Sequence, residues 1–344
     1  MVKIAINGFG RIGRSFFRAV FASPSEVLAK EGGPHLDIVA INDLTDTKTL
    51  AYLLKYDSVY GRYGKTIEVK DHSLVVNGTK IKVFAEKDPQ KLPWKDLGVD
   101  VVVESTGFFA SGEKAKAHLA AGAKRVVITA PADGDVTTAL IGVNDDRFQK
   151  AGPISANASC TTSSVAPVMS ILMENFGIVK AGMTTVHGYT ASQRLVDAPD
   201  AKDLRRGRAA AVNIVPSTTG AAKAVIQVLP ELEGKFDAAA IRVPTINGSL
   251  SMITALVGKK VTPENVNAVF KAAAKEPRWQ KILKVTEDSI VSTDIIGEPY
   301  GAIVDLGLTK VVSGDLVKVF SWYDNEAGYT ATLVEHVRRV VSTL

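Results

Sequence analysis

Cys160 is the only cysteine in the sequence and the residue whose surroundings point most directly to chemistry. It lies within a run of small and hydroxyl-bearing residues, 155–164 (SANASCTTSS), and apolar residues then recur at helical spacing through Phe176. Serine and threonine are typical of a helix N-terminus, so we expect a helix over 162–174 with Cys160 at its start. There the positive end of the helix dipole and unpaired N–H groups stabilise a thiolate. A lone cysteine is ordinarily a small core residue, but this position favours a nucleophile.

A thiolate nucleophile needs a partner that holds its proton, and five histidines are available. His187 ends a predicted strand over 181–189, where its side chain can leave the sheet and enter a cleft. The other four stand in polar turns or on predicted helices: His35, His72, His118 and His336. The sequence leaves two interpretations of His187 open, a base for Cys160 or a hydrogen-bonded structural histidine.

A glycine-rich run follows the first predicted strand directly. Residues 8–13 (GFGRIG) have the G-x-G-x-x-G spacing of a dinucleotide-binding turn that opens a helix. Gly8 permits the tight turn, Gly10 lets a pyrophosphate approach the backbone, and Gly13 allows close packing of helix on strand. The helix N-terminus then faces the anion. The run therefore predicts a dinucleotide site.

Asp43 ends the second predicted strand, where an acidic residue binds the ribose hydroxyls of a dinucleotide. It lies further from the glycine run than the usual spacing of about twenty residues. The polar stretch 23–34 accounts for the extra length. A carboxylate here repels a 2′-phosphate, so NAD is favoured over NADP. The alternative interpretation of Asp43 is a turn or helix-cap residue.

A long polar stretch, 193–208, runs into the segment VPSTTG at 215–220. It contains four arginines, Arg194, Arg205, Arg206 and Arg208. Guanidinium groups, hydroxyls and backbone amides close together suit the binding of phosphate dianions. For any single arginine, a solvated surface loop is the competing interpretation.

The elements that must position these groups form two patterns. In the first part of the chain, short apolar strands alternate with helical stretches, which is typical of βαβ units around a parallel sheet. We expect strands over 2–7, 37–41, 99–104, 124–129 and 139–142, and helices over 12–21 and 113–120. Between them, Asn77-Gly78 predicts a tight hairpin, because this pair accepts the positive φ angles of a two-residue turn.

After about residue 155, longer strand-like runs rich in β-branched residues predict a second, α+β domain with a mainly antiparallel sheet. These runs are 181–189, 249–257, 302–308 and 316–322. The chain ends in a helical stretch with one apolar stripe, which must pack against another part of the protein. We therefore expect an α/β protein with an N-terminal Rossmann domain over 1–158, a catalytic domain over 159–323, and a C-terminal helix over 324–344 that packs back on the first domain.

Composition excludes several classes of protein. The 344 residues are 46% hydrophobic and 22% charged, and the formal net charge of +5 is dispersed, so neither disorder nor a nucleic-acid groove is indicated. No apolar run is long enough to cross a membrane, and strand-like residues begin too early to leave room for a secretory signal. A single cysteine excludes an intrachain disulfide and a cysteine-rich metal site. We expect a cytoplasmic protein without a metal.

Segments along the whole length of the chain are similar to one known family. The sequence resembles the phosphorylating glyceraldehyde-3-phosphate dehydrogenases, which implies NAD as the cofactor and glyceraldehyde 3-phosphate and inorganic phosphate as substrates. The matching segments are 7–14, 42–46, 53–58, 92–108, 158–162 (ASCTT), 184–187 (TTVH), 203–208, 217–225 (STTGAAKAV), 242–245 and 321–326 (SWYDNE).

The resemblance also implies a role for each matching position. Cys160 attacks the aldehyde to form a thiohemiacetal and then a thioester, His187 transfers the protons, and phosphate releases 1,3-bisphosphoglycerate. The implied cofactor contacts, beside the glycine run, are Arg11, Ile12, Asp43, Lys87, Thr129 and Asn325. The implied phosphate-binding positions are Ser159, Thr161, Thr190, Thr219, Gly220 and Arg242, with one arginine of 205–208 assisting, for which Arg205 is our candidate. The family also implies a homotetramer in which the stretch 193–208 reaches the neighbouring subunit's cofactor.

Some positions depart from the commonest family pattern, and other functions remain open. Ser163-Ser164 replaces the usual Asn-Cys, Lys87 stands where an arginine often contacts the adenine side, and Ala327 replaces a bulkier residue. A related dehydrogenase acting on erythrose 4-phosphate shares the Cys/His machinery, although Thr190 and Thr219-Gly220 favour the three-carbon substrate. A non-enzymatic nucleotide-binding scaffold is the other alternative, and the presence of Cys160 and His187 counts against it.

Overall fold

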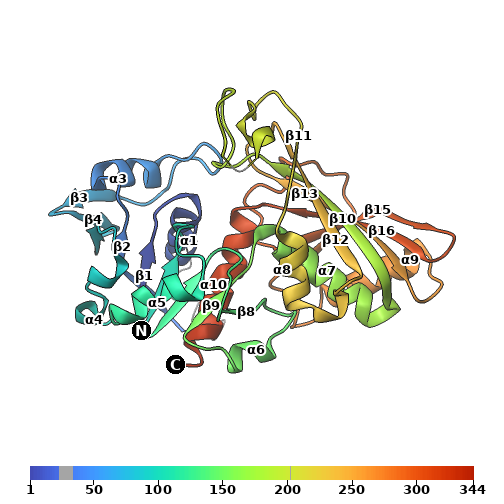
Figure 1. Ribbon diagram of the computed structural model, residues 1–344, viewed down its shortest axis with the longest axis horizontal. Coiled ribbons are helices and arrows are strands. Elements are labelled where there is room, and N and C mark those ends of the chain that lie inside the picture. Colours follow the sequence, from blue (N-terminus) through green and yellow to red (C-terminus); the bar gives the residue numbers. More distant parts are fainter. Residues whose placement is uncertain (23–33, 202) are drawn as a thin grey trace. The chain divides into compact units, whose positions relative to one another are not determined.

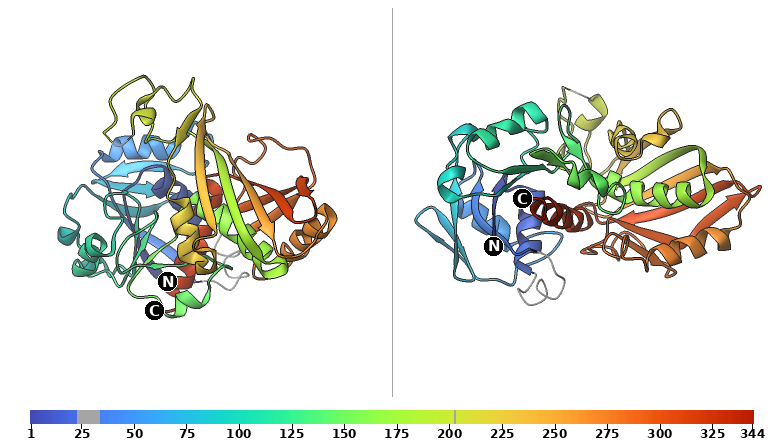
Figure 2. Two further views of the ribbon diagram at one scale, coloured as in Figure 1. Left: turned by 45° about the vertical axis from the view of Figure 1, so that its right-hand side comes forward. Right: turned by 90° about the horizontal axis from the view of Figure 1, so that it is seen from below.

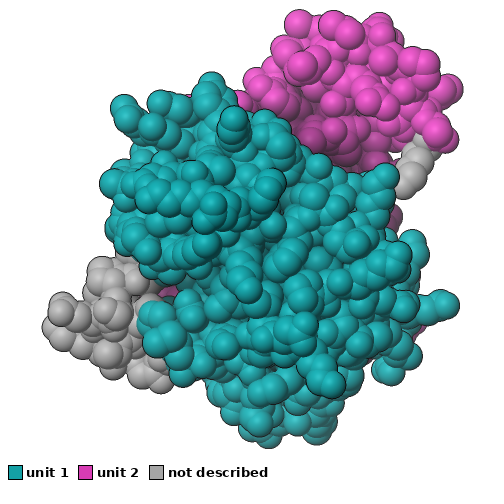
Figure 3. All heavy atoms as spheres, turned by 90° about the vertical axis from the view of Figure 1, so that its left-hand side faces the viewer, with its two compact units in different colours: residues 1–140, 145–158, 333–344 teal, residues 141–144, 159–332 magenta. Residues whose placement is uncertain are grey.

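The computed structural model describes residues 1–22, 34–201 and 203–344. The polar stretch 23–34, which explains the spacing of Asp43 above, lies outside the described residues except for Pro34. The chain forms two compact units, coloured separately in Figure 3. Unit 1 contains Met1–Leu140, Asp145–Ala158 and Leu333–Leu344, and unit 2 contains Ile141–Asn144 and Ser159–Thr332.

Unit 1 is built on a nine-stranded sheet with the order β3-β4-β5-β2-β1-β6-β7-β9-β8. From β5 to β8, all neighbouring strands are parallel, which confirms the predicted parallel sheet. The inner strands are continuous apolar runs because both faces of such a sheet are covered, as in β6, where all four residues are buried. The strands are β1 (Val2–Asn7), β2 (Leu36–Asn42), β3 (Ile67–Lys70), β4 (Ser73–Val76), β5 (Thr79–Phe84), β6 (Val101–Glu104), β7 (Arg125–Ile128), β8 (Thr137–Thr138) and β9 (Ile154–Ala156).

Helices connect the parallel strands of unit 1 (Figure 1). The predicted helices over 12–21 and 113–120 are confirmed as α1 and α5. Side chains cap two of the helices, because Asp46 accepts a hydrogen bond from the backbone N–H of Thr49 and Ser111 accepts one from that of Lys114. The helices are α1 (Arg11–Ala22), α3 (Thr47–Lys55), α4 (Trp94–Leu97), α5 (Gly112–Ala120) and α6 (Asp146–Gln149), with a short 3₁₀ helix at Pro89–Lys91.

The predicted hairpin is confirmed, whereas one predicted strand is wrong. Asn77 and Gly78 have φ angles of 48° and 83°, as a two-residue turn between β4 and β5 requires. The strand expected over 139–142 is instead the short β8, two residues earlier, followed by a turn. The chain cannot continue as a strand because Gly142 has a φ of 78° and packs against Trp279.

The order of the strands creates a switch point between β1 and β6. From β1 the chain passes to β2 on one side, and it later returns to β6 on the other side of β1. Ligands of open α/β sheets bind at such a point, beyond the carboxyl ends of the strands. Here those ends carry Asn7 and Gly8 after β1, Asp43 after β2, and Ser105 after β6.

Unit 2 contains a seven-stranded sheet with the order β11-β12-β10-β13-β16-β15-β14. It is mainly antiparallel, as predicted, and only the pairs β10–β12 and β14–β15 are parallel. Residues of β13 alternate between buried and half-buried, which is the pattern of a sheet with one well-covered face. The strands are β10 (Ile178–Gly188), β11 (Val215–Ser217), β12 (Phe236–Val243), β13 (Ser249–Val257), β14 (Leu283–Thr286), β15 (Ala302–Val312) and β16 (Leu316–Tyr323).

Three helices pack against the sheet of unit 2 (Figures 1 and 2). They are α7 (Cys160–Phe176) against β13, β15 and β16, α8 (Ala221–Val228) against β12, and α9 (Pro263–Ala273) against β15. Short 3₁₀ helices lie at Leu204–Gly207 and Pro230–Leu232. The last helix, α10 (Ala327–Val341), carries the predicted apolar stripe, and its residues from Leu333 onward belong to unit 1. Within the described ranges, no helix combines the length and apolar character needed to cross a membrane.

Candidate active site

Cys160 is the first residue of α7, which confirms the helix N-terminus predicted from the hydroxyl-rich run. Ser159 is the N-cap residue, and its side-chain oxygen accepts a hydrogen bond of 3.2 Å from the backbone N–H of Thr162. Ala158, just before the cap, has a φ of 50°, which alanine rarely adopts. This strained turn presents the half-buried thiol at the start of the helix rather than within it.

The structure brings His187 to Cys160. His187 lies near the end of β10 and is 3% exposed, and its Nε2 atom is 3.5 Å from the Cys160 sulfur. This distance permits a hydrogen bond to sulfur, so the imidazole can exchange a proton with the thiol. The geometry therefore supports the interpretation of His187 as a base for Cys160.

Arg242 contacts the opposite side of the same imidazole. Its Nη1 atom lies 2.5 Å from His187 Nδ1 and 3.1 Å from the Gly188 carbonyl oxygen. His187 Nδ1 is also 2.7 Å from that carbonyl oxygen. The Nδ1 atom therefore has one donor and one acceptor within reach, and the tautomer of His187 depends on which of them it engages.

The electrostatic surroundings keep the Cys160 thiol and the His187 imidazole neutral. Burial raises the pKa of the Cys160 thiol, and the positive charge of Arg242, the Thr161 hydroxyl and the nearby backbone N–H groups oppose this only in part. The thiolate stabilisation that we expected from the helix N-terminus is thus outweighed by desolvation. Burial and the charge of Arg242 lower the pKa of His187 to about 3. A neutral imidazole beside a thiol can act as a base, so the thiol depends on His187 for deprotonation.

Tyr323 is a residue of this site that the sequence analysis missed. Its hydroxyl lies 3.0 Å from Thr161 Oγ1 and 2.7 Å from Thr185 Oγ1, and its ring packs edge-on against His187 with centroids 5.8 Å apart. It therefore links the residue after Cys160 to the strand that carries His187. Burial raises the pKa of Tyr323 to about 12, so it remains a neutral phenol. The signal was present in the matching segment 321–326, but nothing in the sequence marked the tyrosine.

The structure distinguishes among the arginines of the polar stretch. Arg206 directs Nε to Ser217 Oγ at 3.2 Å and Nη2 to the Thr218 carbonyl oxygen at 3.4 Å. Its charge also reaches Arg242, whose pKa it helps to lower after the larger effect of burial. Arg205, our candidate from the sequence, is exposed, and Arg208 pairs with Asp197 at 2.9 Å. The geometry therefore favours Arg206 over Arg205 as the anion-binding arginine.

The other expected phosphate-binding residues are not all free to face a ligand. Thr219 and Gly220 directly precede α8, where the Thr219 hydroxyl accepts a hydrogen bond from the backbone N–H of Ala221. Thr190 Oγ1 lies 2.9 Å from Ser192 Oγ in the following loop. Ser159 Oγ and Thr161 Oγ1 are turned inward, to Thr162 and Tyr323 respectively.

A separate cavity in unit 1 gathers several of the expected cofactor-binding residues. It has a volume of about 500 Å³ and lies at the switch point. Four predicted residues line it: Gly8, Gly10, Asp43 and Lys87. A side chain at Gly8 would collide with the backbone of Thr106, at 2.7 Å, and one at Gly13 would collide with the Gly8 carbonyl oxygen. The space beside Gly10 is open, as the approach of a pyrophosphate requires.

Asp43 is both a wall of this cavity and a support for the glycine turn. Its carboxylate accepts hydrogen bonds from the backbone N–H groups of Phe9, at 2.7 Å, and Thr45, at 2.9 Å. Each oxygen keeps a lone pair that can accept a ribose hydroxyl. A carboxylate, a glycine turn and an apolar cavity fit a dinucleotide without a 2′-phosphate.

Other expected cofactor contacts lie elsewhere. The Arg11 guanidinium binds Asp57, at 2.5 Å, instead of lining the cavity. Ile12 and Gly13 continue α1, and Thr129 follows β7, where its backbone N–H donates to the Glu104 carbonyl oxygen. Asn325 belongs to unit 2, where its side-chain oxygen accepts hydrogen bonds from Ser249 Oγ, at 2.9 Å, and the backbone N–H of Gly248. In the part of the chain that the structure describes, no cluster of three or more His, Cys, Asp or Glu side chains could hold a metal ion.

Two features define the class of protein: unit 1 has a doubly wound sheet with a dinucleotide-type cavity, and unit 2 carries a cysteine–histidine pair. Both are typical of dinucleotide-dependent enzymes that use a cysteine nucleophile. Comparison with known proteins supports this class. Residues 2–112 match the family model described as glyceraldehyde 3-phosphate dehydrogenase, NAD binding domain, and residues 159–325 match the model of its C-terminal domain.

Curated relatives match over nearly their whole length. Proteins named glyceraldehyde-3-phosphate dehydrogenase from Thermotoga maritima, Clostridium pasteurianum and Geobacillus stearothermophilus are 55%, 51% and 51% identical to this chain. The alignments cover 97%, 97% and 99% of this chain and 98%, 97% and 98% of the respective relatives. The chain belongs to the glyceraldehyde-3-phosphate dehydrogenase family.

Proposed function

We propose that this chain oxidises D-glyceraldehyde 3-phosphate to 1,3-bisphosphoglycerate with NAD⁺ and inorganic phosphate. The observation that carries the proposal is the distance of 3.5 Å between Cys160 Sγ and His187 Nε2, in a member of a family whose relatives bear the name of this activity. Erythrose 4-phosphate is not favoured as the substrate, because the relatives compared above are named for the three-carbon aldehyde.

The chemistry begins with the thiol. His187 takes the proton of Cys160 as the sulfur attacks the aldehyde carbon, and it returns this proton to the oxygen of the resulting thiohemiacetal. Bound NAD⁺ supplies the hydride acceptor for the oxidation. His187 then removes the hydroxyl proton, and a thioester forms on Cys160. Phosphate attacks the thioester carbonyl, and the departing sulfur recovers its proton from His187. The thioester conserves the oxidation energy that hydrolysis would dissipate.

The cavity of unit 1 supplies the residues that would hold NAD⁺. Gly8 and Gly10 leave the backbone open to the pyrophosphate, and Asp43 accepts ribose hydroxyls. Lys87 lines the same cavity. Arg11, Ile12, Gly13 and Thr129 would also contact the cofactor, and Asn325 would contact its nicotinamide side.

The anions of the reaction are assigned to the basic and hydroxyl-bearing residues of unit 2. Arg242, Arg206 and the segment Thr219-Gly220 would bind phosphate groups, with Thr190 assisting. The support is the contact of the Arg206 guanidinium with Ser217 and Thr218, just before Thr219-Gly220, and the electrostatic effect of Arg206 on Arg242. Ser159 and Thr161 would contribute through the first turn of α7, where backbone N–H groups face an anion.

The working form would be a cytoplasmic homotetramer, with residues 1–158 and 324–344 serving the cofactor and 159–323 the aldehyde. Support comes from apolar side chains that a single chain leaves exposed in the loop before β11: Leu195 is 78% exposed, Leu204 85% and Val212 77%. An exposed apolar surface of this kind is typical of a protein interface. Light scattering on the purified protein would test the tetramer, and a monomeric mass would contradict it.

The function itself is tested by following NADH formation with glyceraldehyde 3-phosphate, with and without inorganic phosphate. Sustained turnover is expected only with phosphate, because the thioester otherwise remains on the enzyme. A parallel series with erythrose 4-phosphate compares the two kcat/KM values. Phosphate-independent turnover, or a higher kcat/KM for the four-carbon aldehyde, would overturn the proposal.

A further inference from the structure

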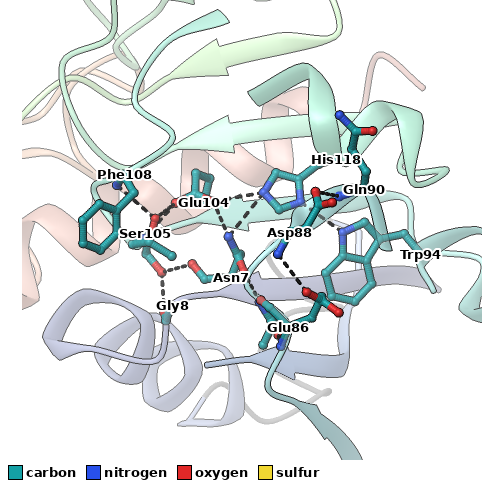
Figure 4. Close-up of polar contacts among 12 residues, drawn as sticks. Asn7, Gly8, Glu86, Asp88, Gln90, Trp94, Glu104, Ser105, Phe108 and His118 are labelled. Carbon is teal, nitrogen blue, oxygen red and sulfur yellow. Dashed lines mark hydrogen bonds and ion pairs between the residues drawn. The ribbon is translucent and has the colours of Figure 1, made fainter. Parts of the chain in front are cut away.

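A continuous chain of buried polar side chains crosses the ends of β2, β1 and β6 next to the cavity of unit 1 (Figure 4). Asn42 Nδ2 donates to Asn7 Oδ1 at 2.7 Å, and Asn7 Nδ2 donates to Glu104 Oε2 at 2.5 Å. These three residues end their strands and are 5%, 1% and 2% exposed. Buried polar groups are costly unless they are hydrogen-bonded, so this network needs a reason to persist where apolar residues would fit.

Glu104 is the centre of the network. Besides Asn7, it accepts hydrogen bonds from His118 Nε2 at 3.0 Å, from the backbone N–H of Thr106 at 2.8 Å and from Thr106 Oγ1 at 2.5 Å. Each of these partners presents a hydrogen-bond donor to the Glu104 carboxyl group. Its two oxygens therefore divide the network into an inner side, toward His118, and an outer side, toward Thr106.

The inner side is rigid because His118 has a single permitted tautomer. Trp94 Nε1 can only donate, and it lies 3.1 Å from His118 Nδ1. The proton of the neutral imidazole must therefore be on Nε2, where it faces Glu104. His118 and Trp94 are both fully buried. The His118 ring also packs edge-on against Phe109, a residue of the cavity wall, with centroids 6.1 Å apart.

The outer side reaches the loop that forms one wall of the cavity. Thr106 Oγ1 donates to Glu104 and accepts the backbone N–H of Phe108 at 3.0 Å. Ser105 Oγ donates to the carbonyl oxygen of Gly8 at 2.6 Å. Ser105, Thr106 and Phe108 all line the cavity, and Phe108 is 77% exposed. The hydrogen bond from the Phe108 backbone N–H to Thr106 Oγ1 is thus a main support of the Phe108 position, since the Phe108 side chain is largely uncovered.

We propose that Glu104 and His118, held by Trp94, are positioning residues that fix the loop 105–108 in the conformation that receives the adenosine part of the dinucleotide. The adenosine part is specified because Asp43, the ribose-binding carboxylate after the second strand, lines the same cavity. The proposal rests on the proposed function, since it assumes that this cavity binds NAD⁺. The proposed reaction does not use Glu104 or His118 as acids or bases.

The first test measures the affinity of the purified protein for AMP and NADH by calorimetry. In Glu104→Gln, the amide NH₂ must face at least one donor, so the network that holds the loop loses a hydrogen bond. In Thr106→Val, the contact between Glu104 and His118 is untouched, and only the hydroxyl that joins Glu104 to Phe108 is removed. Both variants are expected to weaken AMP and NADH binding about tenfold, the effect of losing one hydrogen bond. The rate of Cys160 alkylation without cofactor is expected to stay unchanged.

A matched control separates positioning from a general loss of stability. His336 is a fully buried histidine of the same unit, hydrogen-bonded to Ser155 Oγ and to the Ala139 carbonyl oxygen and absent from the cavity wall. His336→Gln is expected to lower the unfolding midpoint but to leave AMP affinity within about twofold. Equal weakening of AMP binding in His336→Gln and Glu104→Gln would overturn the proposal.

A double-mutant cycle identifies the path through the loop. If Glu104 acts by holding Phe108, then Phe108→Ala and Thr106→Val share one effect, and the double variant binds AMP no more weakly than the worse single variant. Additive losses would mean that the two residues act separately and would overturn the proposal. If the unmodified protein binds neither AMP nor NADH, the proposed function fails. If it binds both and Glu104→Gln and Thr106→Val match it, only the positioning role fails.

Discussion

His187 and Arg242 occupy the same register position on the parallel strands β10 and β12, and their side chains meet at 2.5 Å between Nδ1 and Nη1. Neighbouring positions on adjacent strands place side chains on the same face of a sheet. The pairing of these strands thus aims the guanidinium at one nitrogen of the imidazole, while the other nitrogen faces Cys160. A group that can bind an anion is in this way directly connected to the base of the reaction.

Cys160→Ser is expected to lower aldehyde oxidation by several orders of magnitude, because a serine hydroxyl is a poor nucleophile and forms no thioester. NADH affinity is expected to remain within about twofold, since the cavity is built from residues of unit 1. Steady-state kinetics and calorimetry check the two parts. Near-normal turnover in this variant would contradict the covalent route.

His187→Asn is expected to lower kcat by about 10²- to 10⁴-fold, the usual contribution of a general base. Alkylation of Cys160 by iodoacetamide near neutral pH should also slow, because burial raises the pKa of the thiol and its base is then missing. The pKa of His187 is about 3, so the imidazole of the unmodified protein remains neutral above pH 5. An inflection near pH 6.5 that disappears in His187→Asn would contradict this assignment.

Arg242→Gln is expected to shift the pH profile of Cys160 alkylation to higher pH. The positive charge of Arg242 lowers the pKa of both Cys160 and His187, so its removal raises both values. At a fixed neutral pH, less thiolate is then present and alkylation slows. The KM for the aldehyde should rise as well, since a phosphate-binding group is lost. A profile that moves to lower pH would show that the charge acts in the opposite sense.

Arg206→Gln and Arg205→Gln form a matched pair of variants. Loss of the Arg206 guanidinium should raise the KM for the aldehyde or for phosphate about 10- to 100-fold, as expected for a lost charge-assisted hydrogen bond. Arg205→Gln removes an equal charge from an exposed neighbour and should change either KM less than about threefold. Equal effects of the two variants would mean that net charge, and not position, governs anion binding.

His336 makes unit 1 sensitive to acid. Burial lowers the pKa of His336 to about 4, well below its usual value of 6.5. Between these two pH values, the unfolded chain therefore binds a proton at His336 that the folded chain does not bind. The stability of the folded state that depends on a neutral His336 is fully present above pH 6.5 and is lost as the pH falls toward 4. The loss amounts to about 3 kcal/mol. Urea unfolding should show a smaller change between pH 7 and pH 4.5 in His336→Gln than in the unmodified protein. The same change in both would rule out His336 as the sensitive group.

The local elements of unit 1 could be predicted because their signals are local. The strand 2–7, the glycine turn and the Asn77-Gly78 hairpin follow from backbone requirements that a few adjacent residues meet. The start of α7 was foreseen for the same reason, since Ser159 meets the needs of a helix N-cap. The strand expected over 139–142 was wrong because Gly142 has a positive φ and lies against the distant residues Arg278 and Trp279, which the apolar run itself does not indicate.

The sequence by itself determined the chemical inventory of this protein: one thiol, a histidine at the end of a strand, a glycine turn before a helix, and an excess of arginine and hydroxyl groups near residue 205. Only the tertiary structure decided which of these groups meet. Strand pairing set Arg242 against His187, burial and not the helix dipole set the pKa of Cys160, and the fold of the loop before β11 directed Arg206 toward Ser217. The physical reason is that hydrogen bonding and desolvation depend on distances between residues far apart in the chain, which no local pattern specifies.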